Sequence, residues 1–173
     1  FNVVPIDKNQ GSAEKEELVS FQKKVNELTR TVMGTENFLK EMISKVDKIK
    51  QAILLTPGTS FELLKEADKI KNELNDISLK FNRQTNFPSV EENPPSPVTI
   101  NERLDVLRYT HYRSTEPITK KEKVAYDVLA EEFPKDYKKI KNISEVDIFN
   151  LEKKLELLGA PTIPGKLPEL KLK

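Results

Sequence analysis

The stretch LVSFQKKVNELTRTVMGTENFLKEMISKVDKIKQAI, residues 18–53, decides the fold of this chain. Steps of three and four residues separate its apolar positions, which places them on one face of an α-helix, whereas a strand would alternate every second residue. The seam consists of Leu18, Phe21, Val25, Leu28, Val32, Leu39, Met42, Val46, Ile49 and Ile53, and only Thr35 interrupts the series. Phe38 and Ile43 widen the seam, which favours a multi-helix bundle over a two-stranded coiled coil.

The residues around this seam set the limits of a first helix at about 12–55. Ser12 suits the N-cap position, and the run Thr56-Pro57-Gly58 should stop the helix, because proline and glycine do not continue it. Gly34, near the middle, is either a weak point of the helix or a point of close packing. The helix must lie along other helices of the fold.

A second helix is predicted at about 59–84. Thr59 and Glu62 have the spacing of a capping box, in which the threonine hydroxyl accepts a hydrogen bond from the Glu62 amide. The same three-four rhythm continues through Leu63, Ala67, Ile70, Leu74, Ile77 and Phe81. The short turn between the two helices implies an antiparallel hairpin, and the remaining length of the first helix must be covered by later residues.

A Pro-rich region at 85–98 cannot be helical, because proline lacks the amide hydrogen that a helix needs. We interpret it as an extended crossing loop, with a domain boundary as the alternative. Three shorter helices are expected after it, at about 99–113, 119–142 and 144–158.

Sequence signals mark the ends of these three helices. Capping boxes are predicted at Thr99–Glu102 and Thr119–Glu122, and a similar signal lies at Ser144–Asp147. Gly159 should stop the last helix. Pro134 falls inside the middle helix, where we expect a kink or the first residue of a renewed helix.

The predicted fold is therefore an all-α, elongated helical bundle over residues 12–160, built on a long antiparallel helical hairpin. Residues 1–11 are expected to be a strand-like exit or linker from a preceding domain, with an arm folded onto the bundle as the alternative. Residues 161–173 contain three prolines and should form an extended tail. A first residue of Phe rather than Met suggests a segment of a longer protein or a processed product.

Bulk composition narrows the functional classes. A chain of 173 residues with 36% hydrophobic and 33% charged residues suits one domain of long helices with wide solvated faces. Its net charge of +1 disfavours binding to a nucleic-acid backbone. With no cysteine, a disulfide framework and a thiolate metal site are excluded, and no apolar run approaches the roughly 20 residues that a membrane-inserted helix needs.

Residues that could carry chemistry are few. His111 is the only histidine, so a zinc or iron site is not expected, and the basic and aromatic run 108–113 around it is interpreted as packing or capping rather than base stacking. Neighbouring carboxylates such as Glu16 with Glu17, Glu91 with Glu92 and Glu131 with Glu132 point in different directions on a helix, unlike a glycosidase pair. The cluster Lys135, Lys138, Lys139 and Lys141 is interpreted as a solvated face.

The glycine-rich and nucleophile motifs of nucleotide-binding proteins and hydrolases are absent from the sequence. We therefore predict no catalytic residue, no cofactor and no metal ligand within this chain.

The order of features resembles one protein family. The chain begins with a strand-like exit at Phe1-Asn2-Val3-Val4, and a helical hairpin and a Pro-rich crossing follow it. After the crossing come Arg103-Leu104 and then Pro117-Ile118-Thr119 before Tyr126. The final segment ends Leu157-Leu158-Gly159-Ala160-Pro161. This arrangement is similar to the C-terminal helical region of large bacterial sortilin-like, BNR-repeat β-propeller proteins, which are often labelled glycosyl hydrolases. Pro134 departs from the smoother helix that the resemblance implies.

The resemblance implies a non-catalytic C-terminal accessory or assembly domain of a secreted or periplasmic protein. Its partner would be an upstream β-propeller in the same polypeptide, and any glycan site would lie on that propeller. The alternative is a free-standing coiled-coil module that binds a partner or forms a homodimer through apolar surface left on the first helix.

Overall fold

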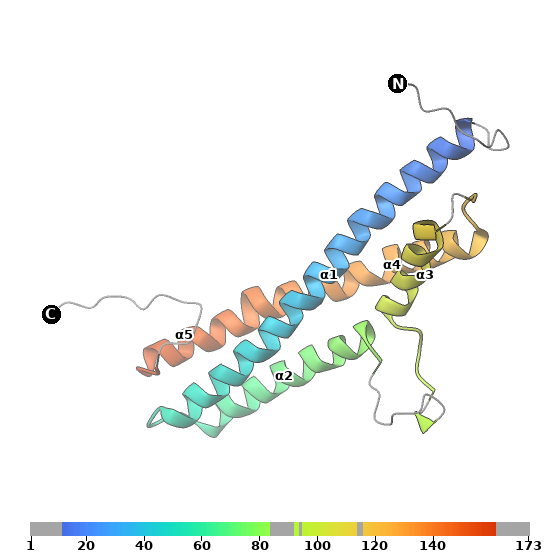
Figure 1. The fold of residues 1–173 in the computed structure, drawn as a ribbon. Coiled ribbons are helices and arrows are strands. Elements are labelled where there is room, and N and C mark those ends of the chain that lie inside the picture. Colours follow the sequence, from blue (N-terminus) through green and yellow to red (C-terminus); the bar gives the residue numbers. More distant parts are fainter. Residues whose placement is uncertain (1–11, 84–91, 94, 114–115, 162–173) are drawn as a thin grey trace.

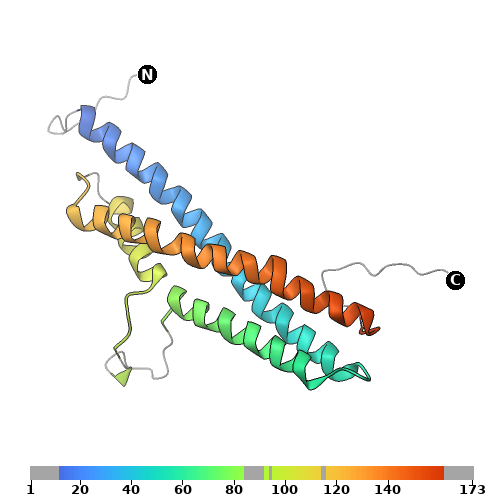
Figure 2. The same cartoon turned by 180° about the vertical axis from the view of Figure 1, so that it is seen from behind.

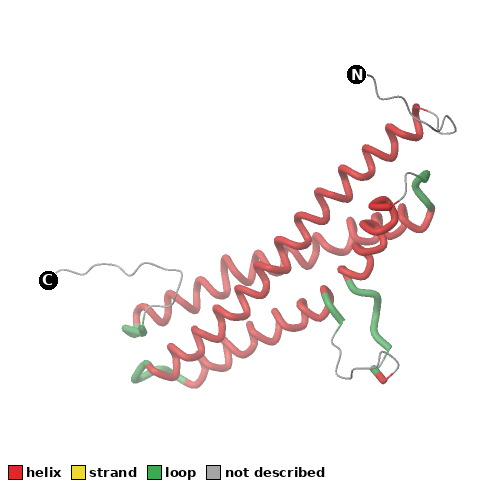
Figure 3. The backbone as a smooth tube through the Cα atoms, viewed as in Figure 1, coloured by secondary structure: helices red, strands yellow, loops and turns green. Residues whose placement is uncertain are grey.

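A computed structural model describes residues 12–83, 92–93, 95–113 and 116–161 of the chain. Within these ranges the regular structure is entirely helical, with no strand (Figures 1 and 3). The elements are α1 (Ser12–Leu55), α2 (Phe61–Phe81), α3 (Ile100–Arg113), α4 (Lys120–Asn142), the π-helical segment η2 (Ile143–Ile148) and α5 (Phe149–Leu157). The predicted all-α helical bundle is confirmed. The strand-like segment predicted at 1–11 and the tail beyond Pro161 lie outside the described residues.

Helices α1 and α2 form the predicted antiparallel hairpin (Figure 1). Gly58 has a φ of +83°, a backbone conformation that favours glycine, and it lies in the turn. The Thr59 hydroxyl lies 2.8 Å from the carbonyl oxygen of Ile53 and 3.0 Å from that of Thr56, and its one hydrogen is shared between these two acceptors. These bonds satisfy carbonyl groups that the end of α1 leaves without helical partners.

The capping box predicted at Thr59 is therefore wrong. The N-cap residue of α2 is Ser60, and its side chain makes no capping hydrogen bond. Thr59 instead ties the turn to the preceding helix, because free carbonyl groups at the end of α1 lie within its reach. The two later boxes are confirmed: the Thr99 amide donates to Glu102 at 2.8 Å, and the Thr119 amide donates to Glu122 at 2.8 Å.

The rod formed by α4, η2 and α5 covers the length of α1 that α2 does not reach (Figure 2). Lys123 near the start of α4 pairs with Glu17 near the start of α1, at 2.7 Å, and Glu152 in α5 pairs with Lys45, at 2.8 Å. The rod therefore runs parallel to α1 and antiparallel to α2. Helix α3 crosses between the end of α2 and the start of α4 (Figure 1).

One hydrophobic core joins the helices before and after the Pro-rich region. The α1 seam contributes Val25, Val32, Leu39, Val46, Ile49 and Ile53, all of them buried. Opposite them lie buried residues of α2, α3, α4, η2 and α5, including Leu74, Phe81, Leu107, Leu129, Phe133, Ile148 and Leu155. The shared core supports the interpretation of the Pro-rich region as a crossing loop rather than a domain boundary.

The backbone stays helical between α4 and α5, where a separate helix was expected to begin at Ser144. The flanking Asn142 and Phe149 both have αR conformation, and the six residues between them, Ile143–Ile148, form the π-helical segment η2. Buried residues on this rod occur at Ile140, Ile143, Ile148 and Leu151. The step from Ile143 to Ile148 therefore spans five residues, whereas the steps on either side span three. A π-helical turn accommodates one more residue than an α-helical turn, which keeps Ile148 on the same face as Ile143.

Pro134 lies on the exposed face of α4, and the helix continues through it without the predicted restart. Proline leaves the carbonyl of Ala130 without its helical partner, but Ala130 is exposed, so water can satisfy this carbonyl.

Helix α5 is stopped by Gly159, as predicted. The φ of Gly159 is +73°, and the Ala160 amide donates to the Leu155 carbonyl at 3.1 Å, which is a Schellman motif.

The five-residue step predicts an unusual tolerance of deletion. Removing the exposed Glu145 should turn η2 into ordinary α-helix with Ile143 and the following isoleucine four residues apart, so the core register is kept. We expect the melting temperature, followed by circular dichroism, to change by less than about 5 °C.

Deleting Asp127 is the matched control, because it is exposed but lies in regular α-helix. That deletion rotates Leu129 and Phe133 by about 100° out of the core, at a cost of about 2–5 kcal/mol for each large side chain. Equal damage from the two deletions would contradict the role assigned to the π-helical turn.

Candidate functional site

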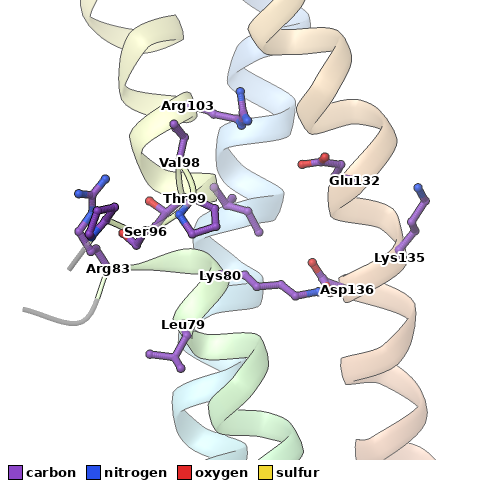
Figure 4. Close-up of a pocket in the computed structure, with 13 residues that line it drawn as sticks. Leu79, Lys80, Arg83, Ser96, Val98, Thr99, Arg103, Glu132, Lys135 and Asp136 are labelled. Carbon is purple, nitrogen blue, oxygen red and sulfur yellow. Dashed lines mark hydrogen bonds and ion pairs between the residues drawn. The ribbon is translucent and has the colours of Figure 1, made fainter.

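A cavity of about 700 Å³ lies where α2 ends, α3 begins and α4 passes both (Figure 4). The last turn of α2 contributes Leu79, Lys80 and Arg83, and the chain entering α3 contributes residues 95–100 and Arg103. The facing wall is α4, with Glu132, Lys135 and Asp136. A cavity of this size, bordered by three helices, is the first candidate for a binding site in this fold.

Ion pairs bridge the walls of this cavity. Lys80 of α2 pairs with Asp136 of α4 at 2.6 Å, and the Asp136 side chain is only 11% exposed. Arg83, just after α2, pairs with Glu102 of α3 at 3.0 Å. The cations and carboxylates of these two pairs neutralise one another, so they connect helices rather than offer free charge to a ligand.

The remaining lining combines apolar and polar groups. Leu79 and Val98 are 47% and 54% exposed, and Pro95 and Pro97 border the same opening. Figure 4 shows the Arg103 and Glu132 side chains extending toward one another from α3 and α4. The cavity is thus an amphipathic recess at a junction of three helices.

A polar cluster centred on Glu36 of α1 lies at the same junction. Its carboxylate accepts hydrogen bonds from Lys40 at 2.6 Å and from the side-chain amides of Asn82 and Asn101, each at 2.9 Å. Asn82 is the C-cap residue of α2 and Asn101 lies in the first turn of α3. One carboxylate therefore ties together three helices.

Hydrogen bonding lowers the pKa of two carboxyl groups at this junction. Burial raises the pKa of Glu36, but the hydrogen bonds from Lys40, Asn101 and Asn82 outweigh it, and the net pKa lies below its ordinary value. For Glu102 the Thr99 amide is the main cause that lowers the pKa, with Arg83 adding to it. Both groups stay ionised at neutral pH, which is the opposite of what a general acid needs.

The residues considered in the sequence as candidates for chemistry are separated in the structure. Glu17 pairs with Lys123 at 2.7 Å, and Glu131 pairs with Lys135 at 3.7 Å, so these carboxylates take part in ion pairs on the surface. Glu91 and the side chain of His111 lie outside the described residues. Lys135, Lys138, Lys139 and Lys141 are exposed along α4, as expected for a solvated face.

The described residues contain neither a metal-binding cluster nor a membrane-spanning helix. No group of three or more histidine, aspartate or glutamate side chains in the described ranges is placed to hold a metal ion. Among the same residues, none of the helices has the length and apolar character that a membrane span requires.

Sequence reasoning did not find the Glu36 cluster or the cavity beside it. Glu36, Asn82 and Asn101 lie on three different helices, and each is an ordinary polar residue in its own segment. The one available signal is Asn82 near the predicted end of the second helix, where asparagine is a common terminating residue.

Comparisons of the chain with protein-family models, with curated proteins and with solved structures find no match.

The Glu36 cluster gives a pH-dependent stability prediction. A carboxyl group whose pKa is lower in the folded than in the unfolded state adds stability above its unfolded pKa, and this contribution is lost as pH falls through the folded pKa. Glu36→Gln should therefore lower the free energy of unfolding at pH 7 by about 1–2 kcal/mol. The deficit relative to wild type should shrink as the pH falls below the ordinary glutamate value of 4.5.

Urea unfolding of both proteins between pH 7 and pH 3 would measure this difference. Glu41→Gln, an exposed position on the same helix, is the control and should have little effect at any pH. A Glu36→Gln deficit that stays constant down to pH 3 would contradict the assigned role of the ionised carboxylate.

Proposed function

We propose that this chain is a non-catalytic accessory or assembly domain of a larger extracytoplasmic protein. The parent we propose is a β-propeller protein of the BNR-repeat, sortilin-like kind, with the propeller upstream in the same polypeptide. The sequence features that resemble that family support this proposal: the helical hairpin, the crossing loop, the box at Thr119 and the Gly159 stop. All of them are structural in kind, which suits an accessory role.

The observation that carries the proposal is the continuous core along α1. This helix has 44 residues, which at about 1.5 Å per residue gives a rod of roughly 66 Å. Ion pairs join the helices of this body to one another: Lys71 of α2 with Asp47 of α1 at 2.6 Å, and Lys154 of α5 with Glu66 of α2 at 2.7 Å. An elongated body with one core is suited to hold other parts of a protein at a fixed separation.

The alternative is a dimerisation module that uses the α1 seam. That function needs apolar seam residues free to meet a second chain, as in a coiled coil. Val32, Val46 and Ile49 have no exposed surface in the single chain, and Leu39 has 1%. The burial of the seam by α2 and the α4–η2–α5 rod favours the accessory domain.

Two measurements test the proposal. The reading frame upstream of the codon for Phe1 should encode a secretion signal and a BNR-repeat β-propeller, and an upstream region without a propeller would contradict the proposed parent. The purified chain should also release no product from a panel of fluorogenic glycosides at high protein concentration. Turnover that scales with the amount of chain, and survives repurification, would contradict a non-catalytic role.

A further inference from the structure

A second cavity, of about 480 Å³, lies between α1 and the α4–η2 rod. We call it the Gly34 groove. Its α1 wall includes Arg30, Gly34 and Phe38, and its facing wall includes Tyr137, Lys141 and Glu145. The groove is distinct from the three-helix junction described above, and it follows two helical segments that run side by side.

Gly34 is unexplained by the packing of the chain itself. It lies inside a 44-residue helix, where glycine costs stability relative to alanine. A Cβ atom added at this position would meet nothing within 4 Å, so no neighbouring group of the described structure requires the missing side chain. The glycine leaves α1 backbone bare on the groove wall, where another chain can approach closely.

Aromatic side chains from both walls border this bare backbone. Phe38 of α1 is 38% exposed and Tyr137 of α4 is 44% exposed. The ring centroids of Tyr137 and the buried Phe133 are 6.1 Å apart, so the tyrosine ring packs against a residue of the core. Exposed aromatic rings around a recess are typical anchor points of protein interfaces.

The charged rim of the groove favours an acidic partner. Arg30 forms no ion pair with any residue that the structure describes. Lys141 is held only loosely, with its nitrogen 3.9 Å from Glu145, and both side chains are more than half exposed. Two cations against one carboxylate leave positive charge that a partner carboxylate would neutralise.

A second copy of the chain fits the groove poorly. In an antiparallel two-fold contact that crosses at Gly34, Glu27 of one copy, seven residues before the glycine, would meet Glu41 of the other, seven residues after it. In a parallel contact, Arg30 would face its own counterpart. Either arrangement places like charges together, which opposes association.

We propose that the Gly34 groove binds an amphipathic α-helix of a partner protein. An apolar side chain of that helix lies over Gly34 between Phe38 and Tyr137, and an acidic side chain faces Arg30. Helices that bind in grooves between helices present anchors at positions i, i+3, i+4 and i+7. The proposal goes beyond an accessory role and does not depend on a propeller parent.

Selection from a displayed library of helical peptides, with the full chain as bait, tests this proposal. We expect enriched peptides with apolar anchors at helical spacing and a nearby Asp or Glu. Gly34→Leu, which fills the groove, and Tyr137→Ala, which removes an anchor, should each weaken their binding by about tenfold or more, and so should Arg30→Glu. The melting temperature of Gly34→Leu should be unchanged or higher, because leucine favours helix and has open space.

Matched controls separate the groove from the rest of the surface. Tyr109→Ala removes an exposed tyrosine on α3, and Lys48→Leu adds a leucine elsewhere on α1, and both should bind as wild type does. Failure to enrich helix-forming peptides would overturn the proposal. So would peptides that bind equally to Gly34→Leu, or a wild-type dimer in sedimentation that Gly34→Leu dissociates, which would identify a second copy as the occupant.

Discussion

Burial of the apolar seam on α1 is the constraint on which the rest of the structure depends. A 44-residue helix with apolar side chains along one face is unfavourable in water, since exposed apolar surface costs about 25 cal/mol per Å². Helix α2 has only 21 residues and covers part of this length. The crossing loop and α3 carry the chain back to the start of α1, where α4 begins and covers the rest. The length of α1 thus explains where each later helix packs.

Polar interactions then fix how the helices meet around that seam. The pairs Lys123–Glu17 and Lys45–Glu152 align the α4–η2–α5 rod with α1 near both of its ends. Glu36 joins α1 to the end of α2 and the start of α3. Burial of apolar surface is not directional, whereas hydrogen bonds and ion pairs require particular partners, so these contacts select one arrangement of the helices.

Much of the fold could be predicted from local signals, because periodicity, caps and stops act within a few residues. The α1 seam, the hairpin turn at Gly58, the boxes at Thr99 and Thr119 and the Gly159 stop belong to this class. The separate helix predicted to begin at Ser144 is wrong, because a helix break and a π-helical turn interrupt an apolar pattern in the same way. The Glu36 cluster and both cavities could not be predicted, since they bring together residues from helices distant in sequence.

The central structural claim is that a single chain closes the α1 seam. Size-exclusion chromatography with multi-angle light scattering, over a wide range of protein concentration, tests it most directly. We predict a monomer with the chain mass of 19.9 kDa at all concentrations, because the seam residues Val32 and Val46 are already covered within the chain. A dimer that dissociates on dilution and loses helical content as it does so would mean that a second chain completes the seam, and would contradict the claim.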